Sequence, residues 1–257
     1  MLLAIDIGNT NIVFGVYEGK NIIDYWRINS DHHKTADEYG ILFFEALKSA
    51  NVIIKKIDNV IIASVVPPLT SVIKRMIQRY FKINALIIDE NTRTGLIKIC
   101  YENPKDVGAD RIVNAVAAYT IYCEPVIIID FGTATTFCAV GRGPEYLGGV
   151  IAPGIMISLE ALFQRTAKLP KVILEPPKTV IGRDTISSIQ SGIIYGYAGL
   201  VDEIIGRIKK EMDGEPYVVA TGGLAEIIAP HTRNIKEINP MLTLEGLRLV
   251  FEMNKGE

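Results

Sequence analysis

Residues 2–16, LLAIDIGNTNIVFGV, form the stretch that decides the fold of this chain. Apolar residues on both sides of a polar turn containing Gly and Asn predict a β-hairpin. Asp6 places a carboxylate at the end of the first buried strand, and Gly8 lets the main chain approach a ligand closely. Main-chain N–H groups together with Asn and Thr side chains can hold phosphate oxygens, and a carboxylate can hold a metal ion. The turn is therefore a candidate phosphate site.

This hairpin has a second copy at residues 126–140, VIIIDFGTATTFCAV. The two stretches align without gaps, which places Asp6 on Asp130 and Val16 on Val140. Either hairpin alone could be an ordinary core element with a polar turn. Two copies with the carboxylate in register favour a duplicated fold with a functional site between its halves.

Length, composition and charge restrict the class of protein. A chain of 257 residues suits one large domain or two ordinary ones. The duplication favours two, residues 1–115 and 116–257, with room for the C-terminal helix to pack back on the first. The net charge of −2 without a basic block argues against nucleic acid as a partner.

The sequence also indicates the cellular compartment. The first residues lack the basic region of a signal peptide, and every apolar run is too short to span a membrane. Three widely separated cysteines without metal-ligand spacing indicate free thiols in a reducing compartment. We therefore expect a cytoplasmic protein without a membrane partner.

The order of the remaining elements indicates an α/β fold with mixed sheets flanked by helices. After the first hairpin, strands are expected at residues 21–27, 60–66, 85–88, 96–101, 145–150 and 217–221. Helices are expected at residues 35–50, 69–80, 109–122, 155–166, 187–212 and 242–253. Thr35 and Glu38 have the spacing of a capping box at the start of the first helix.

Several common catalytic devices are missing from the sequence. It contains neither GxxxxGK[ST] nor a GxGxxG after a strand, so phosphate binding falls to the two hairpin turns and to Gly222-Gly223. The three histidines lie in polar, loop-like segments without metal-ligand partners, where we expect solvated side chains. Catalytic zinc and a Ser-His-Asp triad are therefore poorly supported.

Asp110 is the sharpest catalytic candidate. It lies in the first turn of the expected helix 109–122, between Gly108 and Arg111. There it could accept the proton of a substrate hydroxyl as that oxygen attacks phosphorus. A carboxylate at this position also stabilises the helix through the helix dipole, with Arg111 as its partner. The helix pattern leaves both interpretations open.

Four motifs, in order along nearly the whole chain, resemble those of the type III pantothenate kinases: DIGNTN at 6–11, GADR at 108–111, DFGTAT at 130–135 and GGVIAPG at 148–154. That family belongs to the superfamily of sugar kinases, actin and Hsp70-type chaperones. The resemblance implies a duplicated, two-domain actin-like (ribonuclease H-like) α/β fold and a cytoplasmic homodimer. It also implies ATP-dependent phosphorylation of pantothenate to 4'-phosphopantothenate, the first step of coenzyme A synthesis, with Mg²⁺ and a monovalent cation, K⁺ or NH₄⁺.

The same resemblance implies roles for individual residues. Asp110 would be the proton acceptor, and Asp130 would bind the monovalent cation. Thr185 would reach the substrate from across the dimer interface, so that each site uses both chains. The implied ATP-binding residues are Asp6, Ile7, Gly8, Asn9, Thr10, Asn11, Ile12, Val13 and Thr133. The implied pantothenate-binding residues are Tyr101, Gly108, Ala109, Asp110, Arg111 and Thr185.

Two other functions fit the same motifs. A kinase of this fold could act on another small hydroxylated substrate, because the fold does not determine the acceptor. Some relatives of the family are described as accessory factors for transcription, which would make this chain a regulatory protein. The lack of a basic patch argues against direct DNA contact but not against a protein partner.

Overall fold

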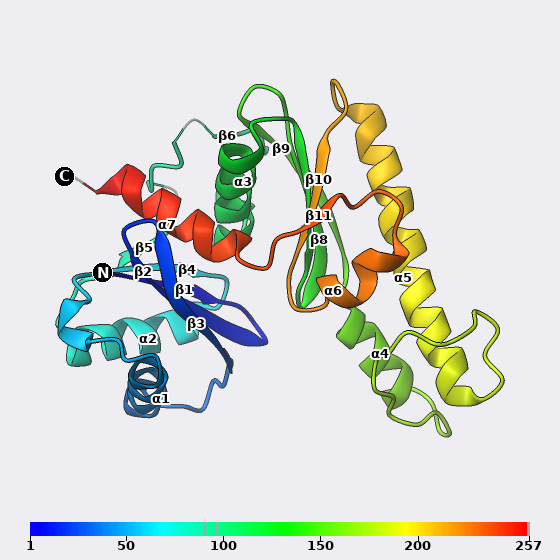
Figure 1. The fold of residues 1–257 in the computed structure, drawn as a ribbon, viewed down its shortest axis with the longest axis horizontal. Coiled ribbons are helices and arrows are strands. Elements are labelled where there is room, and N and C mark those ends of the chain that lie inside the picture. The colour runs from blue at the N-terminus through cyan, green and yellow to red at the C-terminus, as the bar shows by residue number, and fades with distance from the viewer. Residues whose placement is uncertain (90, 96, 256–257) are drawn as a thin grey trace. The chain divides into compact units, whose positions relative to one another are not determined.

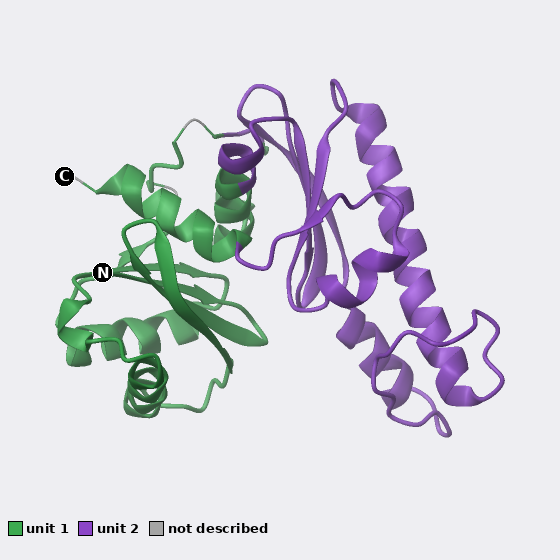
Figure 2. Cartoon of the chain, in the orientation of Figure 1, with its two compact units in different colours: residues 1–97, 101–117, 242–257 green, residues 98–100, 118–241 purple. Residues whose placement is uncertain are grey.

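The computed structural model describes residues 1–89, 91–95 and 97–255, and the chain divides into two compact units (Figures 1 and 2). Unit 1 comprises residues 1–97, 101–117 and 242–257, and unit 2 comprises residues 98–100 and 118–241. Each unit contains one mixed β-sheet flanked by helices, which confirms the expected fold class. The domain boundary expected after residue 115 stays a prediction.

The sheet of unit 1 has the order β3-β2-β1-β4-β5. The antiparallel hairpin β1 (Leu2–Ile7) and β2 (Asn11–Glu18) is extended by β3 (Asn21–Asn29). On the other edge of β1, strands β4 (Asn59–Ser64) and β5 (Leu86–Ile87) add in parallel. The central strand β1 therefore has hydrogen-bonded neighbours on both edges, which suits its nearly uniform apolar sequence.

One face of β1 is covered by two helices, α1 (Ala36–Ser49) and α2 (Pro67–Tyr80). Leu3, Ile5 and Ile7 all pack into this core. Successive side chains of a strand point to opposite faces of the sheet. The even-numbered residues of β1 therefore belong to the other face.

That second face is covered by α7 (Leu242–Asn254), which packs on β1, β2 and β4. A Cβ added to Gly15 would lie 3.0 Å from the Leu244 side chain of α7, and Gly15 pairs with Ala4. Since Asp6 shares the face of Ala4, its carboxylate lies on the α7 side of the sheet.

The sheet of unit 2 has the order β11-β10-β7-β8-β9-β6. Its strands are β6 (Lys98–Ile99), β7 (Val126–Phe131), β8 (Ala134–Val140), β9 (Glu145–Pro153), β10 (Tyr217–Thr221) and β11 (Glu237–Ile238). Five of these strands repeat the order and the pairing directions of unit 1, with β7 in the place of β1. The duplication is therefore confirmed at the level of topology.

The gapless alignment of the two hairpins is wrong beyond the turn. In unit 1 Leu2 pairs with Tyr17, and in unit 2 Val126 pairs with Val140. Val140 therefore corresponds to Tyr17 and not to Val16, because the first turn is one residue longer. Both second strands are apolar on both faces near this point, so alternation could not reveal the register.

The helical segments complete the two units. The remaining α-helices are α3 (Ala109–Tyr122), α4 (Ile155–Gln164), α5 (Thr185–Glu211) and α6 (Ala225–Ile228). The 3₁₀ segments are η1 (Ile54–Lys56), η2 (Pro104–Asp106) and η3 (Ala229–His231). In unit 2 the residues Ile127, Ile129 and Phe131 of β7 form a core with α4, α5 and α6. By alternation, Asp130 lies on the opposite face of that sheet.

The predicted elements are present, with ends that shift by a few residues. The capping box of α1 is confirmed, since Thr35 Oγ1 accepts the Glu38 N–H and the Thr35 N–H donates to the Glu38 carboxylate. The strand expected at 96–101 is reduced to β6, and Leu96 lies outside the described residues. Within the described part of the chain, no helix is both long and apolar enough to span a bilayer.

Gly246 generates a testable prediction about unit 1. A Cβ at this position would overlap the Val113 carbonyl oxygen and lie 2.7 Å from its carbon, so α7 can pack on α3 only with glycine there. Gly246→Ala should lower the free energy of unfolding by roughly 1–3 kcal/mol in urea titrations, because overpacking displaces the helix. Gly206→Ala on α5 is the control: a Cβ there meets no described atom within 4 Å, and stability should rise slightly. Equal effects of the two substitutions would contradict this packing.

Candidate active site

The first turn joins β1 to β2 and presents polar groups to solvent. The Gly8 N–H donates to the Asn11 carbonyl at 3.0 Å, and a Cβ on Gly8 would lie 3.1 Å from that same oxygen. Asn9 and Thr10 are both exposed, while Asp6 is half-buried just before the turn. The turn thus combines a close main-chain approach with amide and hydroxyl side chains, as an anion site requires.

Asp110 lies in the first turn of α3 and folds back over Gly108. A Cβ on Gly108 would lie 2.5 Å from Asp110 Oδ1 and 3.3 Å from the Val65 side chain, so only glycine fits there without a shift. Val65 follows β4, and its N–H donates to the Ile7 carbonyl at 3.1 Å. Asp110 therefore lies at the end of the unit 1 sheet where β1 leads into the first turn.

The environment of Asp110 makes it a stronger base than an exposed carboxylate. Burial raises the pKa of its carboxyl, and a main-chain hydrogen bond and the charge of Arg111 lower it in part. That hydrogen bond joins the Arg111 N–H to Asp110 Oδ1 at 2.8 Å, and the Arg111 side chain is itself buried. A partly desolvated carboxylate at a helix start is suited to accept a proton from a bound hydroxyl.

The second turn is built around Asp130 in unit 2. Gly222, directly after β10, has φ of 91°, and a Cβ there would lie 2.5 Å from Asp130 Oδ1 and 2.7 Å from the Phe131 nitrogen. The glycine therefore allows both the left-handed backbone and the close approach of the carboxylate. Gly154 is packed just as closely, since its Cβ would overlap the Thr133 carbonyl.

Thr185 lies in a different part of unit 2. It is the exposed first residue of α5, after the N-cap Asp184, whose carboxylate accepts the Ser187 N–H at 2.9 Å. An open cleft of about 620 Å³ is lined by Thr185 together with Arg183, Leu162 and other residues of α4 and α5. Both apolar and polar side chains line this cleft, a mixture typical of surfaces that receive another group.

The predicted site residues fall into separate groups, some in unit 1 and others in unit 2. In unit 1, Asp110 and Gly108 lie by the end of the strand that leads into the first turn, and half-buried Tyr101 lies in the loop before η2. In unit 2, Asp130 lies against Gly222, and Thr185 lies in its cleft.

Some functional neighbours could not be identified from the sequence, and one expectation was wrong. Val65 is brought beside Gly108 by the parallel pairing of β1 and β4, a proximity that no local motif reveals. His231 is half-buried with an edge-to-face contact to Tyr195, and not simply solvated as predicted. Among the described residues, no three His, Cys, Asp or Glu side chains gather as a potential metal site.

The two units repeat one sheet topology, and in each the central strand has an aspartate as its next-to-last residue and is followed by a turn that contains glycine. These features define the class of duplicated actin-like α/β proteins. Solved structures share this fold. A Campylobacter jejuni protein described under the Baf family of transcriptional activators superposes with a TM-score of 0.62 at 20% identity, over 98% of each chain. The ADPNP-bound activator of 2-hydroxyisocaproyl-CoA dehydratase from Clostridium difficile gives 0.58 at 14% identity, over 99% of this chain and 97% of its own.

The family follows from closer relatives. The family model described as type III pantothenate kinase matches residues 2–207. A type III pantothenate kinase from Syntrophus aciditrophicus (strain SB) is 51% identical over 254 residues, which cover 99% of this chain and 100% of the relative. The chain therefore belongs to the type III pantothenate kinase family.

The raised pKa of Asp110 predicts a pH-dependent cost in stability. Folding raises this pKa, so the folded protein binds the proton more tightly than the unfolded chain, and stability is lost as pH rises through the two values. Asp110→Asn should therefore unfold at higher urea concentration than wild type at pH 7, with the gap closing below about pH 3, where both states are protonated. Asp213→Asn, at an exposed position, is the control for replacing a carboxylate by an amide and should unfold at the wild-type urea concentration at pH 7. A difference in urea midpoint between Asp110→Asn and wild type that does not change with pH would contradict a raised pKa of Asp110 in the folded protein.

Proposed function

We propose that this chain transfers the γ-phosphate of ATP to pantothenate, giving 4'-phosphopantothenate in the first step of coenzyme A synthesis. Membership of the type III pantothenate kinase family supports this activity. The structural observation that carries it is Asp110, a half-buried carboxylate with a raised pKa at the sheet end that leads into the first turn. The reaction needs a base of this kind for the substrate hydroxyl.

In this proposal the first turn receives ATP. Residues 6–13 surround the phosphates through main-chain N–H groups and the Asn and Thr side chains, and Thr133 makes a second contact. The half-buried carboxylate of Asp6 beside an exposed polar turn fits a nucleotide that carries a divalent cation. Mg²⁺ bound with ATP supplies positive charge that offsets the charge developing on the phosphates.

Asp110 then acts on the acceptor. It accepts the proton of the primary hydroxyl of pantothenate while that oxygen bonds to the γ-phosphorus, and the bond from this phosphorus to the bridging oxygen of ADP breaks. Gly108, Ala109 and Tyr101 are assigned to the pantothenate site beside this carboxylate on the strength of their motif. Arg111 is the cationic partner for the carboxylate of pantothenate, which it can bind through two parallel hydrogen bonds.

We assign the monovalent cation, K⁺ or NH₄⁺, to Asp130. Gly222 provides the fit for such an ion: without a Cβ, it leaves no side chain over Asp130 Oδ1 at that position. Carboxylate and carbonyl oxygens are the donors that hard cations prefer. The assignment of this residue rests on its motif and on that close approach.

A homodimer is the second part of the proposal. Large apolar side chains are exposed on β9, on α4 and around the start of α5: Val150, Ile151, Met156, Ile157, Phe163, Ile173, Val180, Ile181 and Ile186. Exposed apolar groups gathered in one region are typical of a protein interface. Thr185 lies among them, so a two-fold interface here would present it to a partner. The free thiols of Cys100, Cys123 and Cys138 suit the proposed cytoplasmic location.

The two alternative functions receive less support. Another hydroxylated acceptor is compatible with the same geometry, and a substrate screen would identify it. The likeness to the Campylobacter jejuni protein is at 20% identity and shows the fold alone, so it does not favour a regulatory function.

The first test is ADP release from purified protein with ATP and pantothenate, in potassium and then in sodium buffer. We expect turnover that depends on pantothenate and on potassium. Asp110→Asn should reduce turnover by at least about 100-fold, because proton transfer is lost, while binding of a non-hydrolysable ATP analogue survives. Turnover of this variant near the wild-type rate would contradict the proton-acceptor role. Turnover in sodium alone would contradict the assignment of a K⁺ or NH₄⁺ site to Asp130. Turnover only with another alcohol would show that the acceptor is not pantothenate.

The interface has its own test. Ile181 is 82% exposed, and Ile181→Asp should convert the dimer to monomers in sedimentation velocity, because a buried carboxylate would face an apolar partner. Turnover should fall with it, since Thr185 no longer reaches a partner. Ile53→Asp, at a site 55% exposed in unit 1, is the matched control and should leave the dimer intact. An unchanged dimer in the Ile181 variant would place the interface elsewhere.

A further inference from the structure

Ser30, the residue that follows β3, holds the first turn by two hydrogen bonds. Its N–H donates to the Thr10 carbonyl at 2.9 Å, and its Oγ donates to the Gly8 carbonyl at 2.6 Å. Ser30 is half-buried and lies 20 or more residues from the turn in sequence. One serine therefore fixes two of the peptide groups to which the proposed function assigns the ATP phosphates.

These two bonds orient the donors on the opposite side of the turn. In a trans peptide the carbonyl and the following N–H point in opposite directions, and no cis peptide occurs among the described residues. A Gly8 carbonyl directed at Ser30 therefore turns the Asn9 N–H away from Ser30. The Thr10 carbonyl is also directed at Ser30, so the Asn11 N–H likewise points away from Ser30. Oriented N–H groups of this kind are what an anion needs.

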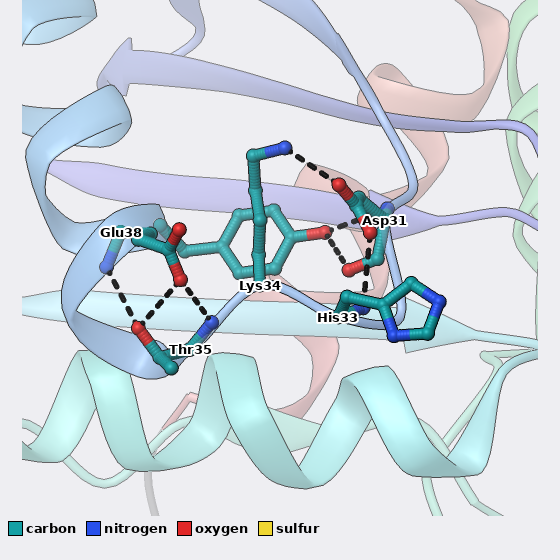
Figure 3. A network of polar contacts seen from close by, with 6 residues as sticks. Asp31, His33, Lys34, Thr35 and Glu38 are labelled. Atoms are coloured by element: carbon teal, nitrogen blue, oxygen red, sulfur yellow. Dashed lines mark hydrogen bonds and ion pairs between the residues drawn. The ribbon is translucent and has the colours of Figure 1, made fainter.

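The segment that carries Ser30 is itself anchored to the core. The Asp31 N–H donates to the Tyr39 hydroxyl at 2.9 Å, and that hydroxyl donates to the Asp31 carbonyl at 3.0 Å. Tyr39 is completely buried in α1. The Asp31 carboxylate accepts the His33 N–H and the Lys34 ammonium at 2.9 and 2.8 Å (Figure 3). The Asp31 N–H and carbonyl are thus both held by the Tyr39 hydroxyl, which restricts the motion of the adjoining Ser30.

The second copy of the hairpin shows that the hydroxyl is specific to the first. Asn29 at the end of β3 pairs with Asn11, and Pro153 at the end of β9 pairs with Ala134. Gly154 therefore occupies in unit 2 the position of Ser30. A Cβ on Gly154 would lie 2.6 Å from the Thr133 carbonyl carbon, which excludes any side chain there. The longer first turn is held by a hydroxyl, and the shorter second turn by direct main-chain packing.

We infer that Ser30 is a positioning residue for phosphoryl transfer: it holds the Gly8 and Thr10 carbonyls so that the N–H groups of Asn9 and Asn11 face the phosphates of ATP. The inference rests on the proposed function for the identity of the ligand. The two Ser30 hydrogen bonds join groups of the protein itself and involve no ligand.

The first experiment uses the protein without ligand. Ser30→Ala should lower the ¹⁵N order parameters of Asn9 and Asn11 from about 0.85 toward 0.6, because the peptide planes are released. Ser30→Thr, which keeps the hydroxyl, should preserve them. Ser49→Ala is the matched control, since Ser49 Oγ also donates to a carbonyl, that of Ala46, at 2.7 Å within α1. Unchanged order parameters in the Ser30→Ala protein would overturn the inference.

The second experiment is kinetic. Ser30→Ala should raise the KM for ATP roughly three- to ten-fold, the effect of losing one hydrogen bond, and leave the KM for pantothenate within about two-fold. Ser30→Thr should restore the KM for ATP, and Ser49→Ala should not change it. A merely structural serine would lower stability and shift both KM values together, which would overturn the inference.

Failure of the proposed function can be told apart from failure of this inference. If the wild type shows no pantothenate-dependent turnover, calorimetric titration with a non-hydrolysable ATP analogue and with adenosine replaces the kinetics. Weaker binding of the analogue by Ser30→Ala, with adenosine binding unchanged, supports the positioning of phosphate by this residue. Equal affinity of wild type and variant for the analogue overturns it.

Discussion

Hydrogen bonding on both edges of β1 and β7 is the constraint on which the rest of the structure depends. Each of these strands lies between an antiparallel and a parallel neighbour and is buried along nearly its whole length. Its sequence must then be apolar on both faces, and a carboxylate is tolerated only near the carboxyl end. Asp6 and Asp130 occupy that position in their strands. Residues that follow the parallel neighbours lie beside these strand ends: Val65, after β4, donates its N–H to the Ile7 carbonyl, and Gly222, after β10, lies against Asp130.

Much of the fold was predictable because its signals are local. Apolar runs broken by turn residues predicted the central strands, and the order of elements predicted two mixed sheets. The register beyond the first turn was not predictable, because Phe14 to Tyr17 and their counterparts are buried on both faces and carry no alternation. Strand β11 and helix α6 were missed for a related reason: two and four residues are too few to show a period.

In the candidate site, too, the local features could be predicted from the sequence and the long-range contacts could not. The turn residues and Asp110 were predicted, since glycine, amide and carboxylate side chains cluster in sequence there. The contacts that give them their properties come from distant segments, and single motifs do not reveal them. Val65 reaches Gly108, beside Asp110, through the pairing of β1 with β4, and the close approach of Asp130 to Gly222 depends on the left-handed backbone of that glycine. Ser30 was missed because a serine after a strand resembles any loop residue; only the register of β3 against β2 places it beside the turn.

The one-residue difference between the turns explains why the two copies no longer hold them in the same way. An additional residue in the turn leaves every strand pair intact, since the extra peptide lies outside the ladder. The longer loop has more conformations to lose on ordering, so it gains more from a side chain that fixes its carbonyls. In the shorter turn the Thr133 carbonyl approaches Gly154 so closely that no side chain could enter. The difference in turn length therefore changes the first turn and leaves the strand pairing of both hairpins intact.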